Sequence, residues 1–342
     1  MRKGTNPQKN KLLDLTRYVH QVIIPVYLPE DGDYFKEGLK ILELCLTSLF
    51  KTVHEKTFIT VVNNGSSQAV VKYLNSLQGK GMLHEVVHTD NIGKNNAILK
   101  ALNGHFYKYI TIADADVLFL EGWQNETMNV FQSLPKAGQV GLIPQMKMHG
   151  YLSSNVLFDY FFSPRLRFTQ VINPEAMKAF YRSLGWGDDY NHNYLTWHLT
   201  LQGSNNLRAA VGTGHVVATY KREALKTGTD IEINELLSTK FDREFLDLPG
   251  LRKGGYRLTT EANYAFHLGN TLEPWMTEIT WSAQPPEFDA SKYSYKPLKG
   301  NKIAHFIKNH LFRKVLENKV FLHWYIGFKG LPKALVKTPW HE

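Results

Sequence analysis

Cysteine is almost absent from this chain of 342 residues, which contains only Cys45. A single cysteine excludes a disulfide within the chain and fits a reducing compartment. Leu42, Leu46 and Leu49 surround Cys45 at helical spacing, so we expect a packed core thiol rather than a nucleophile. The N-terminal stretch is polar and lacks the apolar core of a signal peptide, which indicates a cytoplasmic protein.

Long apolar runs are also missing, because no uncharged stretch reaches the length of a membrane-spanning helix. With 43% hydrophobic and 21% charged residues, the composition is that of a folded protein and excludes a disordered tail protein. The length predicts one elaborated domain or two.

Acidic residues are scarce near the C-terminus. Between residues 299 and 337, nine Lys and Arg face a single acidic residue, Glu317, although the net charge of the whole chain is only +9. The preceding part of the chain is therefore nearly neutral, and we expect no nucleic-acid partner. The basic segment predicts an acidic partner of its own.

Strand-like and helix-like patterns alternate through the first 120 residues. Short apolar runs are separated by stretches with apolar residues at every third or fourth position. The expected strands are 21–28, which ends at Pro25 or soon after, 58–62, 83–88 and 109–113, and the expected helices are 34–53, 68–77 and 94–103. Such alternation builds a parallel sheet whose ligands bind at the carboxyl ends of the strands.

Two carboxylates, Asp114 and Asp116, follow the last of these strands. In an extended chain residues i and i+2 point to the same side, so the two side chains would face one small volume. Their repulsion costs free energy unless a cation or hydrogen-bond donors compensate it, and magnesium and manganese favour carboxylate oxygens. A solvated turn is the alternative interpretation of this fragment.

Other strand ends reach the same edge of the expected sheet. Residues 25–27 and 63–66 follow the first two strands, so three strand ends converge there. This placement makes a ligand site the better interpretation of the acidic pair. Residues 91–97 add a glycine turn, Lys94 and a helix N-terminus, which suit a phosphate, although taken alone they are an ordinary helix start.

In this order the motifs resemble the nucleotide-binding half of family-2 glycosyltransferases with the GT-A fold. The shared features within residues 20–125 are Pro-Val-Tyr after the first strand, Gly-Ser in the second turn, Asn-x-Gly before the third helix, and Asp-x-Asp. The resemblance implies that the nucleotide donor is contacted by Pro25, Tyr27, Asn63, Gly93, Lys94 and Asp114. Asn63 stands where the family usually has an aspartate that contacts the base. An amide also hydrogen-bonds a base edge, so the identity of the base stays open.

Later segments extend the resemblance. Residues 211–215 look like the acceptor loop of the family, whose glycines would let the acceptor approach the backbone. Residues 241–245 precede a Gly-Tyr-Arg motif at about the distance of the family's Glu-Asp pair, with one extra residue between them. The resemblance implies that Asp242 is the general base, with Glu244 and Asp247 as alternatives. A charged helix face is the other interpretation.

The final motif contains His267, which resembles the strand-end His-x-Gly of the family. The resemblance implies that His267 completes a metal site with Asp114 and Asp116, and a satisfied core histidine is the alternative.

Residues 145–205 are rich in aromatic side chains, most of which we expect to fill the core. A group of acidic and histidine residues in this region has a spacing that matches no ligand motif. Its members are Asp188, Asp189, His192 and His198.

The C-terminal segment reads as a basic amphipathic helix. Its apolar residues trace one helical face, formed by Ile303, Phe306, Ile307, Leu311 and Val315. Basic amphipathic helices lie on anionic membrane surfaces, which would make the protein peripheral on the inner face of the membrane. A helix packed on the core with a solvated basic face is an equally good interpretation.

These observations and the resemblance predict an α/β protein with the GT-A fold, a Rossmann-like sheet with helices on both faces that continues into an acceptor-binding half. The expected divisions are an N-terminal tail (1–19), a nucleotide-sugar-binding half (20–145), an acceptor-binding and catalytic half (146–298) and a basic C-terminal segment (299–342).

The resemblance implies an inverting glycosyltransferase of the hexosyl or N-acetylhexosaminyl type that depends on Mn²⁺ or Mg²⁺. Its donor would be a nucleotide sugar, a UDP-sugar in our expectation, and its acceptor a hydroxyl of a glycan or lipid-linked molecule in polysaccharide or glycoconjugate biosynthesis. One alternative is a non-catalytic carbohydrate-binding or scaffold protein. Another is a sugar-phosphate nucleotidyltransferase, which needs a glycine-rich basic loop after the first strand, where residues 28–33 are acidic.

Overall fold

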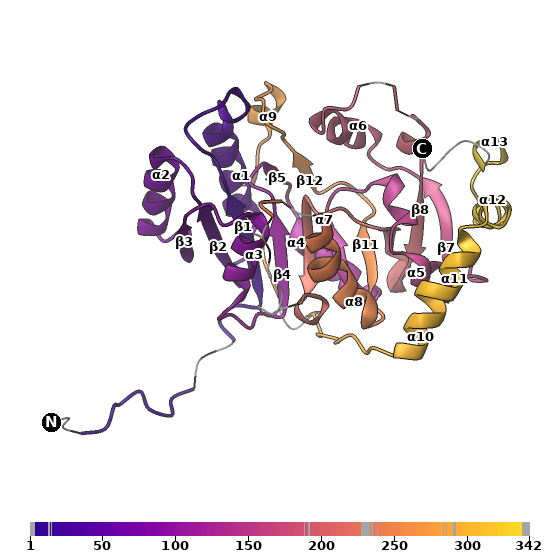
Figure 1. Cartoon of the computed structure of the whole chain (residues 1–342), viewed down its shortest axis with the longest axis horizontal. Helices are drawn as coiled ribbons and strands as arrows, with labels where there is room; N and C mark the ends of the chain where they lie inside the picture. Colours follow the sequence, from indigo (N-terminus) through magenta and orange to yellow (C-terminus); the bar gives the residue numbers. More distant parts are fainter. Residues whose placement is uncertain are drawn as a thin grey trace.

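The computed structural model describes residues 4–12, 14, 16–187, 189–190, 192–226, 233, 235–237, 239–282, 284, 286–289 and 292–336. A ten-stranded sheet runs through the molecule in the order β3-β2-β1-β4-β10-β6-β11-β9-β8-β7, and β12 and β5 form a separate ribbon (Figure 1). The strands are β1 His20–Val26, β2 Thr57–Asn64, β3 Glu85–Thr89, β4 Tyr109–Ala113, β5 Val117–Phe119, β6 Ala137–Gly141, β7 Leu166–Gln170, β8 Trp197–Gln202, β9 Arg208–Val211, β10 Val217–Lys221, β11 Tyr256–Thr260 and β12 Ala265–His267.

Helices cover both faces of the sheet and form the C-terminal end of the molecule. The α-helices are α1 Gly38–Thr52, α2 Gln68–Gly79, α3 Lys94–Leu102, α4 Trp123–Ser133, α5 Ser154–Asp159, α6 Pro174–Ser183, α7 Thr239–Phe241, α8 Leu248–Arg252, α9 Trp275–Glu278, α10 Lys302–Phe306, α11 Phe312–Leu316, α12 Lys319–Phe328 and α13 Lys333–Val336. Short 3₁₀ turns are η1 Asp33–Phe35, η2 Met146–Gly150, η3 His192–Leu195, η4 Ser204–Asn206 and η5 Arg222–Ala224, and π-helical turns are η6 Asp242–Asp247 and η8 Ile307–Leu311.

The first half of the chain has the expected alternation of strands and helices. Strands β3, β2, β1 and β4 are parallel neighbours, joined through α1, α2 and α3. Strand β1 continues one residue past Pro25, but its ladder with β4 ends at Ile23, so the proline needs no hydrogen bond to that neighbour. The first helix begins at Gly38, after the short turn η1, rather than at residue 34.

Alternating side chains of β1 join two separate cores. Val22 and Ile24 pack in the cluster that contains Leu42 of α1, whereas Ile23 packs in the cluster that contains Ile98 of α3. Successive residues of a strand point to opposite faces, so a continuously apolar strand must have a helix layer on each face. The expected α/β class with helices on both sides is confirmed, and Cys45 is a buried core thiol as expected.

The second half of the chain adds mixed strands to the same sheet. Strand β10 runs antiparallel to β4, and β6, β11, β9, β8 and β7 continue from it. This crossing brings the end of β4 next to the start of β10, where the Asp114 N–H donates to the Val216 carbonyl over 2.8 Å. The loop before β10 is therefore held beside the acidic pair. The division of the chain at residues 19, 145 and 298 stays a prediction.

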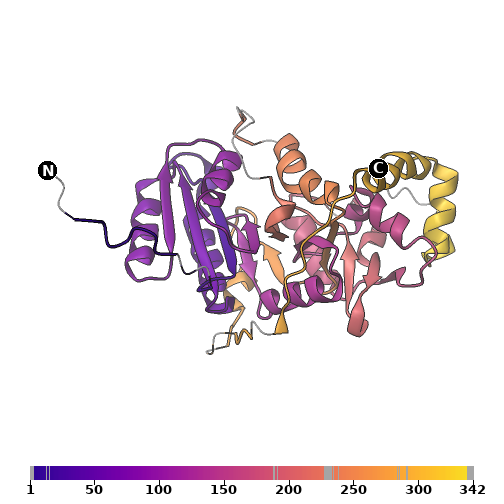
Figure 2. The same ribbon diagram turned by 90° about the horizontal axis from the view of Figure 1, so that it is seen from below.

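The C-terminal helices, in yellow in Figure 2, lie at the opposite end of the molecule from the strands of the N-terminal half. Helix α12 is fastened by the Tyr325 hydroxyl, which donates to the Leu157 carbonyl over 2.9 Å, and the Lys329 carbonyl accepts from the Phe168 N–H over 2.8 Å. The expected helical tail is confirmed. Across the described ranges, no helix combines the length and apolarity that crossing a bilayer requires.

Most aromatic side chains of residues 145–205 do pack as expected. Phe180, Tyr181 and Tyr194 are buried, while Phe162 is the most exposed of this group, with 85% of its surface accessible. In the group of acidic and histidine residues formed by Asp188, Asp189, His192 and His198, Asp188 lies outside the described residues.

Candidate active site

A cavity of about 420 Å³ opens at the carboxyl ends of β1, β2 and β4. The convergence of three strand ends predicted from the alternation is therefore confirmed, because Pro25, Asn64 and Asp114 all line this cavity. Tyr27 lines it as well and is 41% exposed, with its ring 5.8 Å from that of Phe35 in an edge-on contact. One side of the cavity thus offers aromatic faces and the other offers charges.

The end of β2 carries two asparagines with different roles. The Asn63 side chain is buried, where its amide nitrogen pairs with His88 over 2.9 Å and its oxygen accepts the Ser66 N–H over 3.1 Å. Asn64 lines the cavity together with Asn91, and its amide nitrogen donates to the Asn91 side chain over 3.2 Å. Adjacent residues of a strand face opposite ways, so only one of the two can face the cavity. The resemblance points to Asn63 rather than Asn64, and alternation along the strand excludes only that both of them face the cavity.

The N-terminus of α3 is covered by a loop. Gly93 has φ +83°, and a Cβ at this position would lie 3.1 Å from backbone atoms of Leu236. The Lys94 N–H donates to the Leu236 carbonyl over 2.9 Å, so this amide already has a partner. Gly93 therefore allows residues 235–237 to lie across the helix start, where Leu236 and Leu237 become part of the cavity wall. The expected phosphate contact of Gly93 and Lys94 stays a prediction.

Asp114 and Asp116 both line the cavity, as the spacing of two residues predicts. Asp114 forms an ion pair with the Lys94 ammonium group. One oxygen of Asp116 lies 3.2 Å from His267 Nε2. The other oxygen, Oδ1, is buried and has no hydrogen-bond partner in the part of the chain that the structure describes. The two carboxylates are therefore compensated separately, and one oxygen keeps a free coordination position.

The surroundings of Asp114 and His267 shift the pKa values of both groups. Burial raises the pKa of the Asp114 carboxyl and the neighbouring Asp116 charge adds to this, while Lys94 opposes it. Burial lowers the pKa of His267, but the hydrogen bond and charge of Asp116 outweigh it, so that this pKa lies above its ordinary value. Asp114 thus has Lys94 as its cationic partner, and Asp116 has His267.

Ser183 at the end of α6 orients His267. The Ser183 hydroxyl lies 2.8 Å from His267 Nδ1 and is itself 2.6 Å from the Phe180 carbonyl. A hydrogen bond on one ring nitrogen fixes which way the other nitrogen points, and here that nitrogen faces Asp116. No sequence signal connected Ser183 with the site, because 84 residues separate it from His267.

A divalent cation fits this donor set. Asp116 Oδ1 offers an unshared carboxylate oxygen, and carboxylate oxygens with one imidazole suit Mn²⁺ or Mg²⁺. Among the described residues, no three His, Cys, Asp or Glu side chains already form a metal cluster. Ions of this kind commonly take one or two carboxylates from the protein and complete their ligands with substrate phosphates. The assignment of Asp114, Asp116 and His267 as ligands stays a prediction.

Asp242 lies in the π-helical turn η6, between α7 and α8. A π-helical turn contains one residue more than an α-helical turn, which accounts for the extra residue noticed in the sequence. Asp242 Oδ2 is 4.0 Å from His215 Nδ1, and 29% of the side chain is exposed. Burial raises the pKa of Asp242, and His215 and Lys94 lower it in part. The charges of Asp247 and Asp114 add to the rise.

The two alternative bases have other surroundings. Glu244 lies 3.7 Å from both Arg243 and Arg252, whose side chains are about half exposed. Asp247 is fully buried and lies 3.0 Å from His215 Nε2 and 3.0 Å from Arg257 Nε. Asp242 and Glu244 are both partly exposed, whereas Asp247 is fully buried, and the choice of the base among the three stays a prediction.

Arg257 holds the loop before β10 in place. Its guanidinium group donates to the Thr213 carbonyl over 2.6 Å and to the Tyr151 carbonyl over 2.9 Å. Gly212 has φ +92°, and a Cβ there would overlap the Met148 carbonyl. Gly212 is therefore required by packing against η2, whereas the sequence analysis expected the loop glycines to serve the approach of an acceptor.

The sequence and the fold were compared with known proteins. Residues 22–187 match the model of Glycosyl transferase family 2. Similar solved structures include Staphylococcus aureus TarS 1–349, with 17% identity, 36% of this chain and 35% of that chain covered and a TM-score of 0.30. TarS 1–349 in complex with UDP-GlcNAc has 13% identity, coverage of 93% and 69%, and a TM-score of 0.43.

A third similar structure is the mannosyltransferase PcManGT from Pyrobaculum calidifontis in complex with GDP-Man and Mn²⁺. It has 15% identity, coverage of 94% of this chain and 75% of that chain, and a TM-score of 0.41. In the first TarS comparison this chain spans about a third of the relative's length. None of the curated proteins matches the sequence.

Proposed function

We propose, from the match of residues 22–187 to the model of Glycosyl transferase family 2, an inverting, metal-dependent transferase that moves a sugar from a UDP-sugar to a hydroxyl group. The sugar is a hexose or N-acetylhexosamine, and the acceptor is a glycan or lipid-linked molecule. The observation that carries the proposal is the cavity at the strand ends, which is lined by Asp114, Asp116 and Lys94 and in which Asp114 is paired with Lys94.

The donor would occupy the cavity at the strand ends. The amide groups of Asn64 and Asn91 can both donate and accept hydrogen bonds, as the edge of a uracil base does. The exposed ring of Tyr27 offers a face on which a base can stack. Lys94 would then exchange its ion pair with Asp114 for the donor's phosphate oxygens, which carry more negative charge.

Asp116 and His267 would hold the divalent cation, with Asp114 contacting the ribose or a water on the cation. When bound, the cation acts as a Lewis acid for the negative charge that develops on the diphosphate. Ser183 serves this function indirectly, because it keeps His267 turned toward Asp116.

Asp242 is the general base in this proposal. The acceptor oxygen forms a bond to the anomeric carbon while the bond from that carbon to the diphosphate oxygen breaks. The nucleoside diphosphate leaves with the bonding electron pair, and the acceptor's proton goes to Asp242. Attack from the face opposite the leaving group inverts the configuration. The raised pKa of Asp242 suits this role, because a more basic carboxylate accepts a proton more readily.

We also propose that the C-terminal helices bind an anionic membrane surface. The apolar face of α10, η8 and α11 is open to solvent, and Ile303 and Phe306 are 73% and 54% exposed. Trp324 of α12 is 53% exposed as well. Lysine and arginine dominate the same segment, so apolar insertion and attraction to acidic lipids act together. Sedimentation with vesicles tests this proposal. The protein should bind anionic but not zwitterionic vesicles, and a protein that sediments with neither kind of vesicle contradicts it.

The transferase itself is tested by calorimetry and donor turnover. UDP should bind only weakly without Mn²⁺ and at least about ten-fold more tightly with it. Asp116→Asn should abolish this dependence on the cation, whereas Asp289→Asn, a half-exposed control, should retain it. Release of UDP from a radiolabelled UDP-sugar supports a transferase.

Two results would contradict the proposal. If no UDP- or GDP-sugar is turned over or bound with Mn²⁺, a non-catalytic scaffold is the better description. If the protein instead releases pyrophosphate from a nucleoside triphosphate and a sugar phosphate, it is a nucleotidyltransferase.

A further inference from the structure

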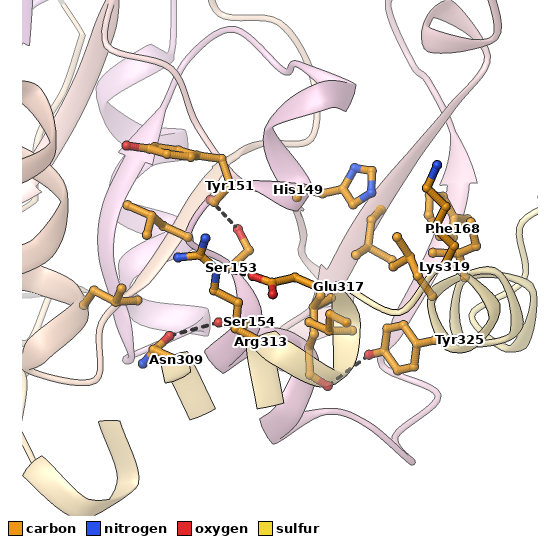
Figure 3. A pocket seen from close by; sticks show the side chains of 18 of the residues that line it. His149, Tyr151, Ser153, Ser154, Phe168, Asn309, Arg313, Glu317, Lys319 and Tyr325 are labelled. Carbon is orange, nitrogen blue, oxygen red and sulfur yellow. Dashed lines mark hydrogen bonds and ion pairs between the residues drawn. The ribbon is translucent and has the colours of Figure 1, made fainter. Parts of the chain in front are cut away.

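A second cavity, of about 460 Å³, lies under the C-terminal helices. Its walls come from η2 and α5, from β7 and β8, and from η8, α11 and α12, as Figure 3 shows. It shares no lining residue with the cavity at the strand ends. The proposed donor site therefore leaves this cavity without a function.

Hydrocarbon dominates the lining of this second cavity. The apolar side chains include Leu157, Phe168, Leu199, Leu316, Leu322 and Ile326. Several polar groups of the lining are already bonded to protein atoms. Ser154 donates to the Asn309 side chain over 3.2 Å, Ser153 to the Tyr151 carbonyl over 3.1 Å, and Tyr325 to the Leu157 carbonyl over 2.9 Å. A sugar would lose hydrogen bonds to water in such a cavity, whereas an alkyl chain would not.

One end of this cavity reaches the residues around the proposed base. Arg243, which lines it, directly follows Asp242 in η6. Tyr151, also in the lining, accepts a hydrogen bond from Arg257, which is bonded to Asp247. Arg243 thus links the cavity to η6 at the residue after Asp242, and Tyr151 links it through Arg257 to Asp247.

The charges of the lining are mainly positive. Arg243, Arg313 and Lys319 contribute three cations, and Glu317 is the single anion. Arg313 is paired with Glu317 over 3.3 Å, and Arg243 shares the single carboxylate of Glu244 with Arg252, so the positive excess lies at Lys319 and at these two arginines. An apolar cavity with this charge is complementary to an amphiphile that carries an anionic group.

We propose that this cavity binds the hydrocarbon chain of a lipid-linked acceptor, with the anionic group of the lipid beside Arg243 and the acceptor hydroxyl extending to Asp242. This inference rests on the proposed transferase and names its acceptor class. The helices that form one wall, α11 and α12, also carry exposed apolar residues, among them Val315 and Trp324. A lipid could therefore enter the cavity from the bilayer surface without crossing water.

Decyl phosphate is a suitable probe, titrated by calorimetry into the full-length protein below its micelle concentration. Leu322→Trp should fill the cavity and weaken binding at least about ten-fold. Val320→Trp is the matched control, because it introduces the same side chain two residues earlier in α12, at a position that is 80% exposed. This variant should bind decyl phosphate as the wild type does. Inorganic phosphate and decyl maltoside separate the contributions of the anion and the chain, and each should bind more weakly than decyl phosphate.

A second pair of variants tests the anionic contact without altering the core. Arg243 and Arg252 both lie 3.7 Å from Glu244, but only Arg243 lines the cavity. Arg243→Gln should weaken decyl phosphate about five-fold, and Arg252→Gln should leave it unchanged.

The inference is overturned if Leu322→Trp keeps the melting temperature of a folded protein but binds decyl phosphate as tightly as Val320→Trp does. It is also overturned if inorganic phosphate binds as tightly as decyl phosphate. Equal effects of Arg243→Gln and Arg252→Gln would also overturn the anionic contact. Binding of UDP with Mn²⁺ is measured on the same proteins. If the wild type does not bind UDP with Mn²⁺, the proposed function itself is wrong. If it binds UDP but not decyl phosphate, only this inference is wrong.

Discussion

Replacing Asp242 by asparagine and Glu244 by glutamine distinguishes two of the three candidate bases at the smallest structural cost. Each change removes a negative charge and a proton acceptor while keeping the shape of the side chain. Asp242 lies beside His215 and is influenced by Lys94, whereas Glu244 is paired with Arg243 and Arg252 near the surface. The two variants therefore test location as well as charge.

The expected sizes differ by orders of magnitude. A positioned general base contributes about a hundred- to ten-thousand-fold to the rate, so Asp242→Asn should raise the barrier by about 3–5 kcal/mol. Glu244 makes only half-exposed ion pairs at 3.7 Å, each worth about 0–1 kcal/mol of stability, and kcat should change less than about two-fold. Donor binding should be unaffected in both, because neither side chain lines the donor cavity.

The assay measures sugar transfer by steady-state kinetics with UDP binding recorded separately. Transfer by the wild type should rise with pH as Asp242 loses its proton, with a midpoint above the ordinary carboxyl value of about 4, since burial raises this pKa. This acidic limb should disappear in Asp242→Asn. Full activity of Asp242→Asn, or an equally large loss in Glu244→Gln, would refute the assignment of the base.

Three further predictions concern the surroundings of the site and the core. His215→Gln removes a group that lowers the pKa of Asp242, so the acidic limb of the pH–rate profile should move to higher pH. His198 is 2% exposed, and burial lowers its pKa to about 4. Because the unfolded histidine takes up a proton between pH 7 and pH 5, the free energy of unfolding should fall by about 2 kcal/mol over this range. In urea titrations His198→Leu should reduce this loss, and an unchanged pH dependence would contradict it. Gly212→Ala should cost about 1–3 kcal/mol more than Gly81→Ala, because both have positive φ but only Gly212 lacks space for a Cβ, and equal urea midpoints would contradict the packing argument.

Local patterns were sufficient for the elements and for the acidic pair. Apolar periodicity reports which side of a strand or helix is buried, and this property depends on near neighbours in the chain. The spacing of Asp114 and Asp116 therefore placed both in one cavity, and the order of strands placed that cavity at the carboxyl ends of β1, β2 and β4. Apolar periodicity could not choose between Asn63, which the resemblance names, and Asn64, since either face of β2 is buried.

The partners of the site residues depend on contacts between distant parts of the chain. Ser183 meets His267 across 84 residues, and His215 meets Asp247 across 32. Nothing in the periodicity of either segment encodes these pairs, because they arise from the way β10 and β12 return beside β4 and β5.

The sequence alone determined the α/β class, the place of the acidic pair and the basic amphipathic tail, because each follows from the spacing of neighbouring residues. Only the tertiary structure decided which asparagine lines the cavity at the strand ends, what surrounds each candidate base, and that an apolar cavity lies under the C-terminal helices. These features follow from packing between distant segments, which the order of residues does not reveal until the chain is folded.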